Sequence, residues 1–312
     1  MAIWTDIEGA ATTPVADPAV VTIGVFDGVH RGHRTLIDEA RREADERGAV
    51  VVAVTFWPHP VAVLAPDRAP VRLTSIERRV ELLHEAGADH VRVLAFSRDL
   101  AAWDPERFID EVVMDQCHAV HVVVGENFRF GAKAAGDVAL LGAAGAQLGF
   151  TVTGVELTGD CAPFSSTRAR QLLADGDVVA VSAILGRPHE VAGEVVHGDH
   201  RGAQLGFPTA NVLVDDAVAA PADGVYACWL VRADGSRLPA ATSVGTNPTF
   251  AGVAGRRVES YVLDRDDLDL YGEHVRVEFV ERLREMTAFE DVEALVQQMR
   301  ADVDAARTIL LG

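Results

Sequence analysis

The sequence is poor in lysine, in cysteine and in long hydrophobic runs. Lys133 is its only lysine, and the net charge of −19 argues against binding duplex nucleic acid through a broad basic surface. Cys117, Cys161 and Cys228 form no CxxC pair, which predicts free thiols rather than a disulfide framework or a zinc site. No apolar run approaches the length needed to cross a bilayer, and the acidic N-terminal segment lacks the basic region of a secretory signal. These absences predict a cytoplasmic protein.

The first half of the 312 residues alternates apolar segments with amphipathic helical ones. The apolar segments are uninterrupted, which is typical of parallel strands covered on both faces. Sheets of this kind bind ligands beyond the carboxyl ends of their strands. Strands are expected at residues 19–26, 49–56, 90–96 and 119–125, with helices at 33–48, 74–87 and 104–114.

Two of these helices carry clear start signals. Thr74 and Glu77 have the spacing of a capping box. Asp104 followed by Pro105 has the pattern of an N-cap residue with proline at the first helical position. We therefore expect the helices to begin at these residues.

The pattern changes near residue 186. Helical segments at 167–176 and 177–186 are followed by short β-like segments without helices between them, which predicts a small barrel with a closing helix packed on it. The chain is accordingly divided into domains of residues 1–186 and 187–312. The later strands are expected at 224–233, 238–245, 256–264 and 274–283, and the closing helix at 289–310.

The segment "VTIGVFDGVHRGHRTLI" places His30 and His33 around a glycine, where a buried strand passes into a helix. Free N–H groups and the positive end of the helix dipole make such a junction a place for phosphate. Histidines three residues apart share one side of the first helical turn, and both can donate to phosphoryl oxygens. The pattern favours direct phosphoryl or nucleotidyl transfer, since no side chain here is an obvious covalent nucleophile. A merely structural turn is the alternative.

The string "GVFDGVHRGH" resembles the H-x-G-H signature of the nucleotidyltransferase superfamily, in the form carried by prokaryotic FAD synthetases. These are bifunctional riboflavin kinase/FMN adenylyltransferases. Residues 54–60, 123–131 and 164–170 resemble further motifs of that family, in the same order. The resemblance implies a Rossmann-like nucleotidyltransferase domain that binds ATP through Gly24, Asp27, His30, His33, Ser165, Ser166, Thr167 and Arg168, and FMN through Pro58, Asn127 and Phe128.

Each flanking motif has a plainer interpretation when taken alone. "WPHP" would be a rigid turn with His59 at the surface, Phe128 would be a core residue, and "SSTR" would be a helix N-cap. Many relatives have Asp where this chain has Asn127, and an amide is not suited to an acid–base role. Only the shared order of the motifs favours the functional interpretation.

A second glycine-rich segment, "GEVVHGDHRGAQLGFPTAN", matches neither a Walker A motif nor a dinucleotide fingerprint. Its scattered glycines allow the backbone to approach a polyphosphate. Thr209 and Asn211, two apart in an extended segment, point to the same side and offer a hydroxyl and an amide oxygen. Magnesium accepts such ligands when phosphates and water complete its octahedron. On these residues alone, a glycine-rich hairpin is the alternative.

This segment resembles the riboflavin kinase motif with its core G-F-P-T-A-N, and "VESYVLD" (258–264) is a further match. The resemblance implies that Thr209 and Asn211 hold Mg²⁺ and ATP phosphates, with Glu259 as the general base for the ribityl 5′-hydroxyl. It also implies a β-barrel kinase domain with a C-terminal helix. The glycines implied in ATP binding are Gly193, Gly198 and Gly206.

The resemblance implies Mg²⁺ as cofactor, riboflavin, FMN and ATP as substrates, and FMN, FAD and pyrophosphate as products. Two alternatives stay open: a monofunctional nucleotidyltransferase whose barrel only binds substrate, and a non-enzymatic flavin-binding or regulatory protein. The intact "GFPTAN" and "VES" strings argue against the first alternative. A binding protein could lose the phosphate-side residues while keeping the flavin loops, but here both sets are present. No nucleic-acid or membrane partner is expected, and homo-oligomerisation is left open.

Overall fold

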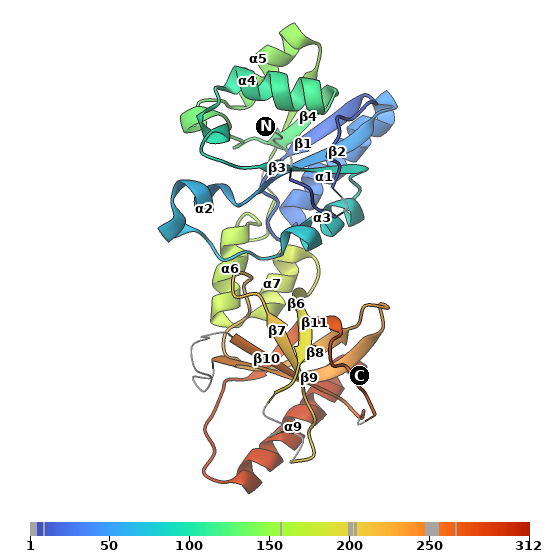
Figure 1. Ribbon diagram of the computed structural model, residues 1–312, viewed down its shortest axis with the longest axis vertical. Coiled ribbons are helices and arrows are strands. Elements are labelled where there is room, and N and C mark those ends of the chain that lie inside the picture. Colours follow the sequence, from blue (N-terminus) through green and yellow to red (C-terminus); the bar gives the residue numbers. More distant parts are fainter. Residues whose placement is uncertain are drawn as a thin grey trace. The chain divides into compact units, whose positions relative to one another are not determined.

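The computed structural model describes residues 5–8, 10–156, 158–198, 202, 205–246, 256–265 and 267–312. The chain forms two compact units (Figure 1). The first comprises Met1–Pro70 and Ser75–Ser165, and the second comprises Val71–Thr74 and Ser166–Gly312. Helices α6 (Ser166–Asp175) and α7 (Val178–Leu185) thus pack with the second unit. The domain boundary at residue 186 stays a prediction.

The first unit is built on a parallel five-stranded sheet in the order β3-β2-β1-β4-β5. The predicted parallel sheet is therefore confirmed, with one further strand at its edge. The strands are β1 (Ala19–Ile23), β2 (Val50–Trp57), β3 (His90–Ala95), β4 (Ala119–Gly125) and β5 (Thr151–Val155). The helical elements are α1 (Arg31–Arg47), α2 (Pro60–Leu64), η1 (Pro66–Arg68), α3 (Ile76–Glu85), η2 (Leu100–Ala102), α4 (Pro105–Phe108), the π-helical η3 (Ile109–Gln116), η4 (Ala132–Ala134) and α5 (Val138–Leu148).

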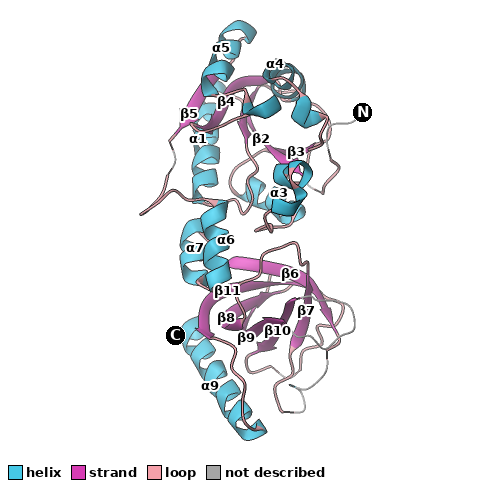
Figure 2. Cartoon of the chain, turned by 90° about the vertical axis from the view of Figure 1, so that its left-hand side faces the viewer, coloured by secondary structure: helices cyan, strands magenta, loops and turns pink. Residues whose placement is uncertain are grey.

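Helices cover both faces of this sheet (Figure 2). Val20 and Val21 are neighbours on β1, so their side chains point to opposite faces. Val21 belongs to a core with Ile109 of η3 and Leu141 of α5, whereas Val20 belongs to a core with Ile37 of α1. Because both faces of the sheet are buried, the side chains on both sides of each strand are apolar, and the strands appear as uninterrupted apolar runs in the sequence.

One of the two predicted helix starts is confirmed and the other is wrong by one residue. The Asp104 side chain caps α4 by accepting a hydrogen bond from the Arg107 N–H at 2.8 Å, with Pro105 at the first helical position. Ser75 caps α3, because its hydroxyl accepts from the Arg78 N–H at 3.1 Å. Thr74, the predicted cap, lies one residue before this N-cap.

The second unit contains the predicted barrel, closed by six antiparallel strands in the order β10-β7-β6-β11-β8-β9. The last helix packs on it, where Ala306 joins Ala227, Ala241 and Leu263 in a small core. Asp234-Gly235 forms the turn between β8 and β9, where the Gly235 N–H donates to the Arg232 carbonyl at 2.9 Å. The elements are β6 (His189–Val196), β7 (Ala210–Val214), β8 (Gly224–Val231), β9 (Arg237–Thr246), β10 (Arg256–Val262), β11 (His274–Arg284) and α9 (Val292–Leu311).

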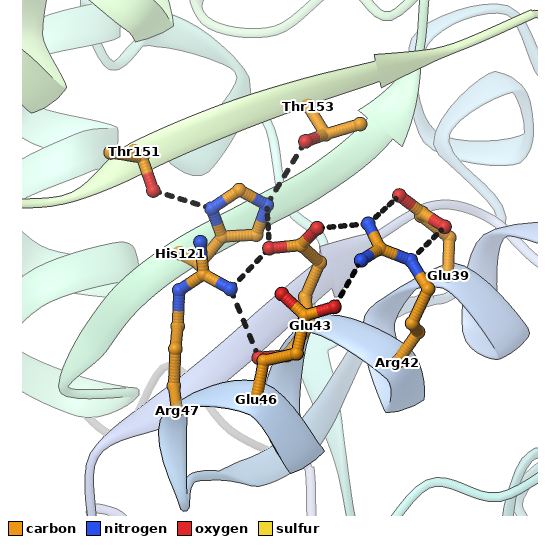
Figure 3. Close-up of polar contacts among 8 residues, drawn as sticks. All are labelled: Glu39, Arg42, Glu43, Glu46, Arg47, His121, Thr151 and Thr153. Atoms are coloured by element: carbon orange, nitrogen blue, oxygen red, sulfur yellow. Dashed lines mark hydrogen bonds and ion pairs between the residues drawn. The ribbon is translucent and has the colours of Figure 1, made fainter.

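A polar cluster with a buried centre lies between the second half of α1 and strands β4 and β5 (Figure 3). His121 is almost fully buried, with Thr151 Oγ1 2.5 Å from its Nδ1 and Thr153 Oγ1 3.1 Å from its Nε2. Glu43 approaches the same Nε2 at 3.6 Å and forms an ion pair with Arg47. Burial, with a further contribution from the Arg47 charge, lowers the pKa of His121. Glu39, Arg42 and Glu46 complete the cluster.

Candidate active sites

The two histidines of the first site lie in the turn that connects β1 to α1. Gly24 directly follows β1, and its N–H donates to the Val54 carbonyl of β2 at 3.1 Å. His30 is the N-cap of α1, and its Nδ1 accepts a hydrogen bond from the His33 N–H at 3.3 Å. The two imidazole rings stack with centroids 3.5 Å apart. The structure thus brings the predicted pair together at a helix N-terminus.

The protonation of this pair follows from its surroundings. Because Nδ1 of His30 accepts the His33 N–H, a neutral His30 carries its proton on Nε2. Burial lowers the pKa of His33 well below its ordinary value, and the nearby charges of His30 and Arg79 lower it further. The edge of the Phe26 ring packs on His33, with centroids 5.1 Å apart. His33 is therefore neutral at pH 7 in the free protein.

A buried ion pair supports the turn. Arg79 of α3 and Asp27 are both buried, and Nη2 of the arginine lies 3.4 Å from the aspartate Oδ1. The other terminal nitrogen of Arg79 donates to the Phe56 carbonyl at 3.3 Å and to Thr55 Oγ1 at 3.5 Å. Arg79 thereby links the turn to the end of β2, a role that the sequence analysis missed. The predicted role of Asp27 in ATP binding stays a prediction. The Asp27 side chain is buried in the protein interior.

The predicted flavin-side residues follow neighbouring strands of the same sheet. Strands β1 and β4 are adjacent although they are far apart in the sequence, so the ends of both open at one edge of the sheet. After β4 come Asn127, which is exposed, and Phe128, which is half-buried and stacks on buried Phe130 with centroids 5.4 Å apart. Pro58 is exposed directly after β2. The structure places these segments at the edge that carries the histidine turn.

The predicted "SSTR" segment lies where the first unit ends. Phe164 packs under the Arg31 guanidinium, whose carbon lies 4.8 Å from the ring centroid. Ser165 follows Phe164 directly, and Ser166, Thr167 and Arg168 form the first turn of α6. The role of these four residues in ATP binding stays a prediction.

The second site is organised by cross-strand pairs of the barrel. Glu259 on β10 lies directly opposite Asn211 on β7 and opposite Ser243 on β9. Directly opposed residues in antiparallel strands place their side chains on the same face, close enough to interact. Thr209 precedes β7 by one residue, two positions before Asn211. The Arg257 guanidinium lies 3.8 Å from Glu259 Oε1. The predicted base and metal ligands are thus neighbours.

Two cavities meet at Thr209. The larger, of about 250 Å³, is lined by Glu259 and by apolar residues of the barrel and of α9. The smaller, of about 80 Å³, is lined by Arg265 and Tyr271 among others, and His197 stacks on Tyr271 with ring centroids 3.9 Å apart. Thr209 lines both cavities. A group transferred between ligands in the two cavities would pass the Thr209 side chain.

The three predicted glycines of this site lie in different local environments. Gly198 makes room for the Asn211 carboxamide, because a side-chain carbon there would lie about 2.4 Å from its nitrogen. Gly193 lies on β6 opposite Val214, and Gly206 precedes buried Phe207 with a positive φ of 87°. Residues 199–201 and 203–204, which belong to the predicted glycine-rich segment, lie outside the described residues, as do residues 247–255.

The residues of the second site fit magnesium only in company with phosphate. Among the described residues, no group of three or more His, Cys, Asp or Glu side chains could hold a metal ion. Thr209 and Asn211 offer neutral oxygens, and Glu259 adds a carboxylate opposite Asn211. Mg²⁺ is commonly held by few protein oxygens together with substrate phosphates and water. This donor set therefore fits a nucleotide-bound Mg²⁺.

A parallel sheet with a histidine turn at its switch point, together with a closed barrel carrying an acid and an amide on facing strands, defines a two-domain transferase that acts on phosphate groups. Residues 12–168 match the family model of FAD synthetase, and residues 185–310 match that of riboflavin kinase. The chain belongs to the family of bifunctional riboflavin kinases/FMN adenylyltransferases.

Individual relatives agree over nearly the whole chain. It is 38% identical over 289 residues to the bifunctional riboflavin kinase/FMN adenylyltransferase of Escherichia coli (strain K12), covering 92% of this chain and 91% of that one. It is 39% identical over 293 residues to the enzyme of the same name from Pseudomonas fluorescens, covering 93% and 92%. A crystal structure described as a macrolide-efflux protein from Streptococcus pneumoniae has the same fold, with a TM-score of 0.85, 32% identity and 95% of each chain covered.

These findings favour the bifunctional enzyme over the two alternatives. The chain is a riboflavin kinase and FMN adenylyltransferase of flavin cofactor biosynthesis, with ATP and flavins as its substrates. In the part of the chain that the structure describes, none of the helices is both long and apolar enough to span a membrane.

Proposed function

We propose that the histidine turn of the first unit performs adenylyl transfer. A phosphate oxygen of FMN attacks the α-phosphorus of ATP, the bond to the β-phosphate oxygen breaks, and pyrophosphate leaves as FAD forms. The carrying observation is the stacked pair of His30 and His33 at the N-terminus of α1, where ring N–H groups and backbone N–H groups can donate to phosphate oxygens. Asn127 and Phe128 would contact the flavin from the neighbouring strand end.

The binding of ATP would change the charge of this site. Burial and nearby positive charge lower the pKa of His33 in the free protein, so the imidazole is neutral. A triphosphate beside the ring reverses the local field and favours the imidazolium. His33 would then add a positive charge at the position where negative charge develops in the transition state, without a lysine.

The barrel would make the FMN. The ribityl 5′-hydroxyl of riboflavin gives its proton to Glu259 while its oxygen attacks the γ-phosphorus of ATP, and ADP leaves. The larger cavity beside Glu259 is lined mainly by apolar groups and would hold the flavin ring, and the smaller cavity beyond Thr209 would hold nucleotide. Bound Mg²⁺ would neutralise phosphate charge. Thr209 and Asn211 would orient the phosphates next to Glu259.

We also propose that the enzyme acts in the cytoplasm. The three cysteines are free, and two of them, Cys117 and Cys228, are buried. Burial raises the pKa of the Cys117 thiol to about 12, so this thiol is unreactive. Free, widely spaced thiols support a reducing compartment.

The test is a chromatographic time course of the purified protein with riboflavin, ATP and Mg²⁺. FMN should appear first and FAD should follow. His33→Ala should lower FAD formation by roughly a hundredfold or more while FMN accumulates. Glu259→Gln should abolish FMN formation from riboflavin and leave the adenylylation of supplied FMN unchanged. A folded variant of either kind that loses both reactions would contradict the assignment of separate sites.

A further inference from the structure

The larger cavity of the second unit lies between the barrel strands and helix α9. Barrel strands supply one side, including Glu259 and Tyr261. Helix α9 supplies the other through Leu295, Met299 and Val303, which recur every four residues and so form one stripe along the helix. Asp302 of the same helix and Arg284 of the barrel also line the cavity. The stripe faces the cavity in which the proposed kinase reaction takes place.

The two halves of α9 differ in how they are attached. In the second half, Ala306 is fully buried and belongs to the core that joins the helix to the barrel. In the first half, residues 292–301 include none that is buried. Asp302 is the first buried residue along the helix. Of the residues of α9 that line the cavity, Leu295 and Met299 therefore lie in the half without a buried residue, and Asp302 and Val303 lie where the buried half begins.

Asp302 is held by Arg284, the last residue of β11. Arg284 Nε donates to Oδ1 at 2.9 Å, and its Nη2 donates to Oδ2 at 2.8 Å, so that the guanidinium fork faces both carboxylate oxygens. Gln298, one helical turn earlier, donates to Oδ1 at 2.9 Å. The Asp302 side chain is 8% exposed and that of Arg284 21% exposed. Two-point pairs of this kind fix orientation as well as distance.

Such a pair contributes more to geometry than to stability. The cost of removing both charges from water offsets most of their attraction, so a well-packed apolar pair of similar volume can be equally stable. The planar fork nevertheless accepts a carboxylate in one geometry only. The pair lies where the first half of α9, which has no buried residue, meets the buried second half, a position from which it can fix the direction of the first half.

We propose that the Arg284–Asp302 ion pair is a positioning element that holds the first half of α9 against the cavity, and that it thereby sets the affinity of the kinase site for riboflavin. This inference rests on the proposed function of the cavity. Neither residue takes a chemical part in phosphoryl transfer. Loss of the pair loosens the wall that contacts the flavin and leaves Glu259, Thr209 and Asn211 in place on the barrel.

The experiment compares the kinase kinetics of Asp302→Asn and Arg284→Lys with those of the wild-type chain. The KM for riboflavin should rise about tenfold or more, while kcat and the KM for ATP change by less than about threefold. Adenylylation of supplied FMN serves as an internal control and should stay at the wild-type rate. Direct titration of riboflavin fluorescence should show the same loss of affinity without turnover.

Arg307→Gln is the matched control. Arg307 lies on the same helix and forms ion pairs with Asp264 and Asp304, but its partners are exposed and it does not line the cavity. Its removal should leave the KM for riboflavin unchanged. An equal rise of KM in Arg307→Gln would contradict a specific role for the buried pair.

The double variant Arg284→Met/Asp302→Leu distinguishes positioning from direct contact of a charge with the ligand. It replaces the pair with apolar side chains that can pack, so the KM should return to within about threefold of wild type. A double variant as impaired as Asp302→Asn would overturn the positioning role. If wild type makes FMN and Glu259→Gln does not, but folded Asp302→Asn keeps the wild-type KM, only this inference fails. If wild type makes no FMN, the proposed function fails first.

Discussion

Glu259 and Asn211 lie directly opposite each other on β10 and β7, although 48 positions separate them in the sequence. The pairing places an acid and an amide on one face of the barrel, at the point where Thr209 lines both cavities. The antiparallel register, rather than a loop, fixes their spacing. The proposed base and the proposed phosphate-orienting amide are therefore held in place by the barrel itself, without a ligand.

The pairing predicts that Asn211→Ala impairs the kinase through the metal-bound nucleotide. The rate of FMN formation should fall about tenfold to a hundredfold, and the Mg²⁺ concentration at half-maximal rate should rise, because one oxygen is lost beside the phosphates. Initial rates at graded Mg²⁺ concentrations measure both effects. Leu213→Ala is the control, since Leu213 is exposed two residues further along β7. Identical Mg²⁺ curves for wild type and Asn211→Ala would argue against the ligand role.

A second prediction concerns the glycine between the histidines. A side-chain carbon at Gly32 would lie 3.3 Å from both Cε1 and Nδ1 of the His30 ring. Gly32→Ala should therefore displace this ring and slow FAD formation about tenfold, although alanine favours the helix by about 1 kcal/mol. Kinase activity should be unchanged, and the thermal midpoint should not fall.

Gly142→Ala is its matched control. Gly142 lies within α5, and a side-chain carbon there meets nothing within 4 Å. This substitution should raise the thermal midpoint and leave both reactions unchanged. Equal FAD formation by wild type and Gly32→Ala would show that the position of the His30 ring does not matter.

The third prediction separates two roles for Asp27. Its side chain is 1% exposed and pairs with Arg79, which is 0% exposed. Asp27→Asn leaves the Arg79 charge buried without its carboxylate and should lower the free energy of unfolding of the first unit by about 3 kcal/mol. Urea unfolding measures this loss. Asp27→Asn/Arg79→Met should recover part of it. If Asp27→Asn keeps wild-type stability and only raises the KM for ATP, Asp27 is an ATP ligand, as the family resemblance implies.

Much of the fold could be predicted because its causes are local. Apolar runs mark the strands of the parallel sheet, and the shorter β-like segments mark the barrel. Strand β5 was missed because it is an edge strand of partly exposed residues, "TVTGV", and α5 because its sequence contains glycines. The residues that support the sites were missed for a different reason. Arg79 lies in an amphipathic helix where an arginine usually faces water, and only tertiary packing buries it.

The same limit applies to Asp302, which stands among several acidic residues of the closing helix. Nothing in its local sequence distinguishes it from Asp304, which is exposed. Arg284 pairs with Asp302 because the end of β11 packs against α9 at the position of Asp302. Pairs of this kind are set by how elements pack, so the composition of either segment does not reveal them.

The fourth prediction concerns pH and the cluster around His121. Burial lowers the pKa of this histidine from its ordinary value of 6.5. The unfolded chain therefore binds a proton at a higher pH than the folded chain does, and the stability of the first unit is complete above about pH 6.5 and falls as the pH drops below it. The lowered pKa of His33 acts in the same direction. Each histidine contributes a slope of at most about 1.4 kcal/mol per pH unit.

His121→Gln keeps polar groups near Thr151 and Thr153 but does not titrate, so it should flatten the loss of unfolding free energy between pH 7.5 and 5.5, roughly the range in which histidine titrates. Urea unfolding followed by tryptophan fluorescence in a Trp229→Phe background measures the unfolding free energy of the first unit at each pH, because the remaining tryptophans all belong to that unit. His118→Asn removes an exposed histidine three residues away and should leave the slope unchanged. An unchanged slope in His121→Gln would mean that other groups cause the acid sensitivity of this unit.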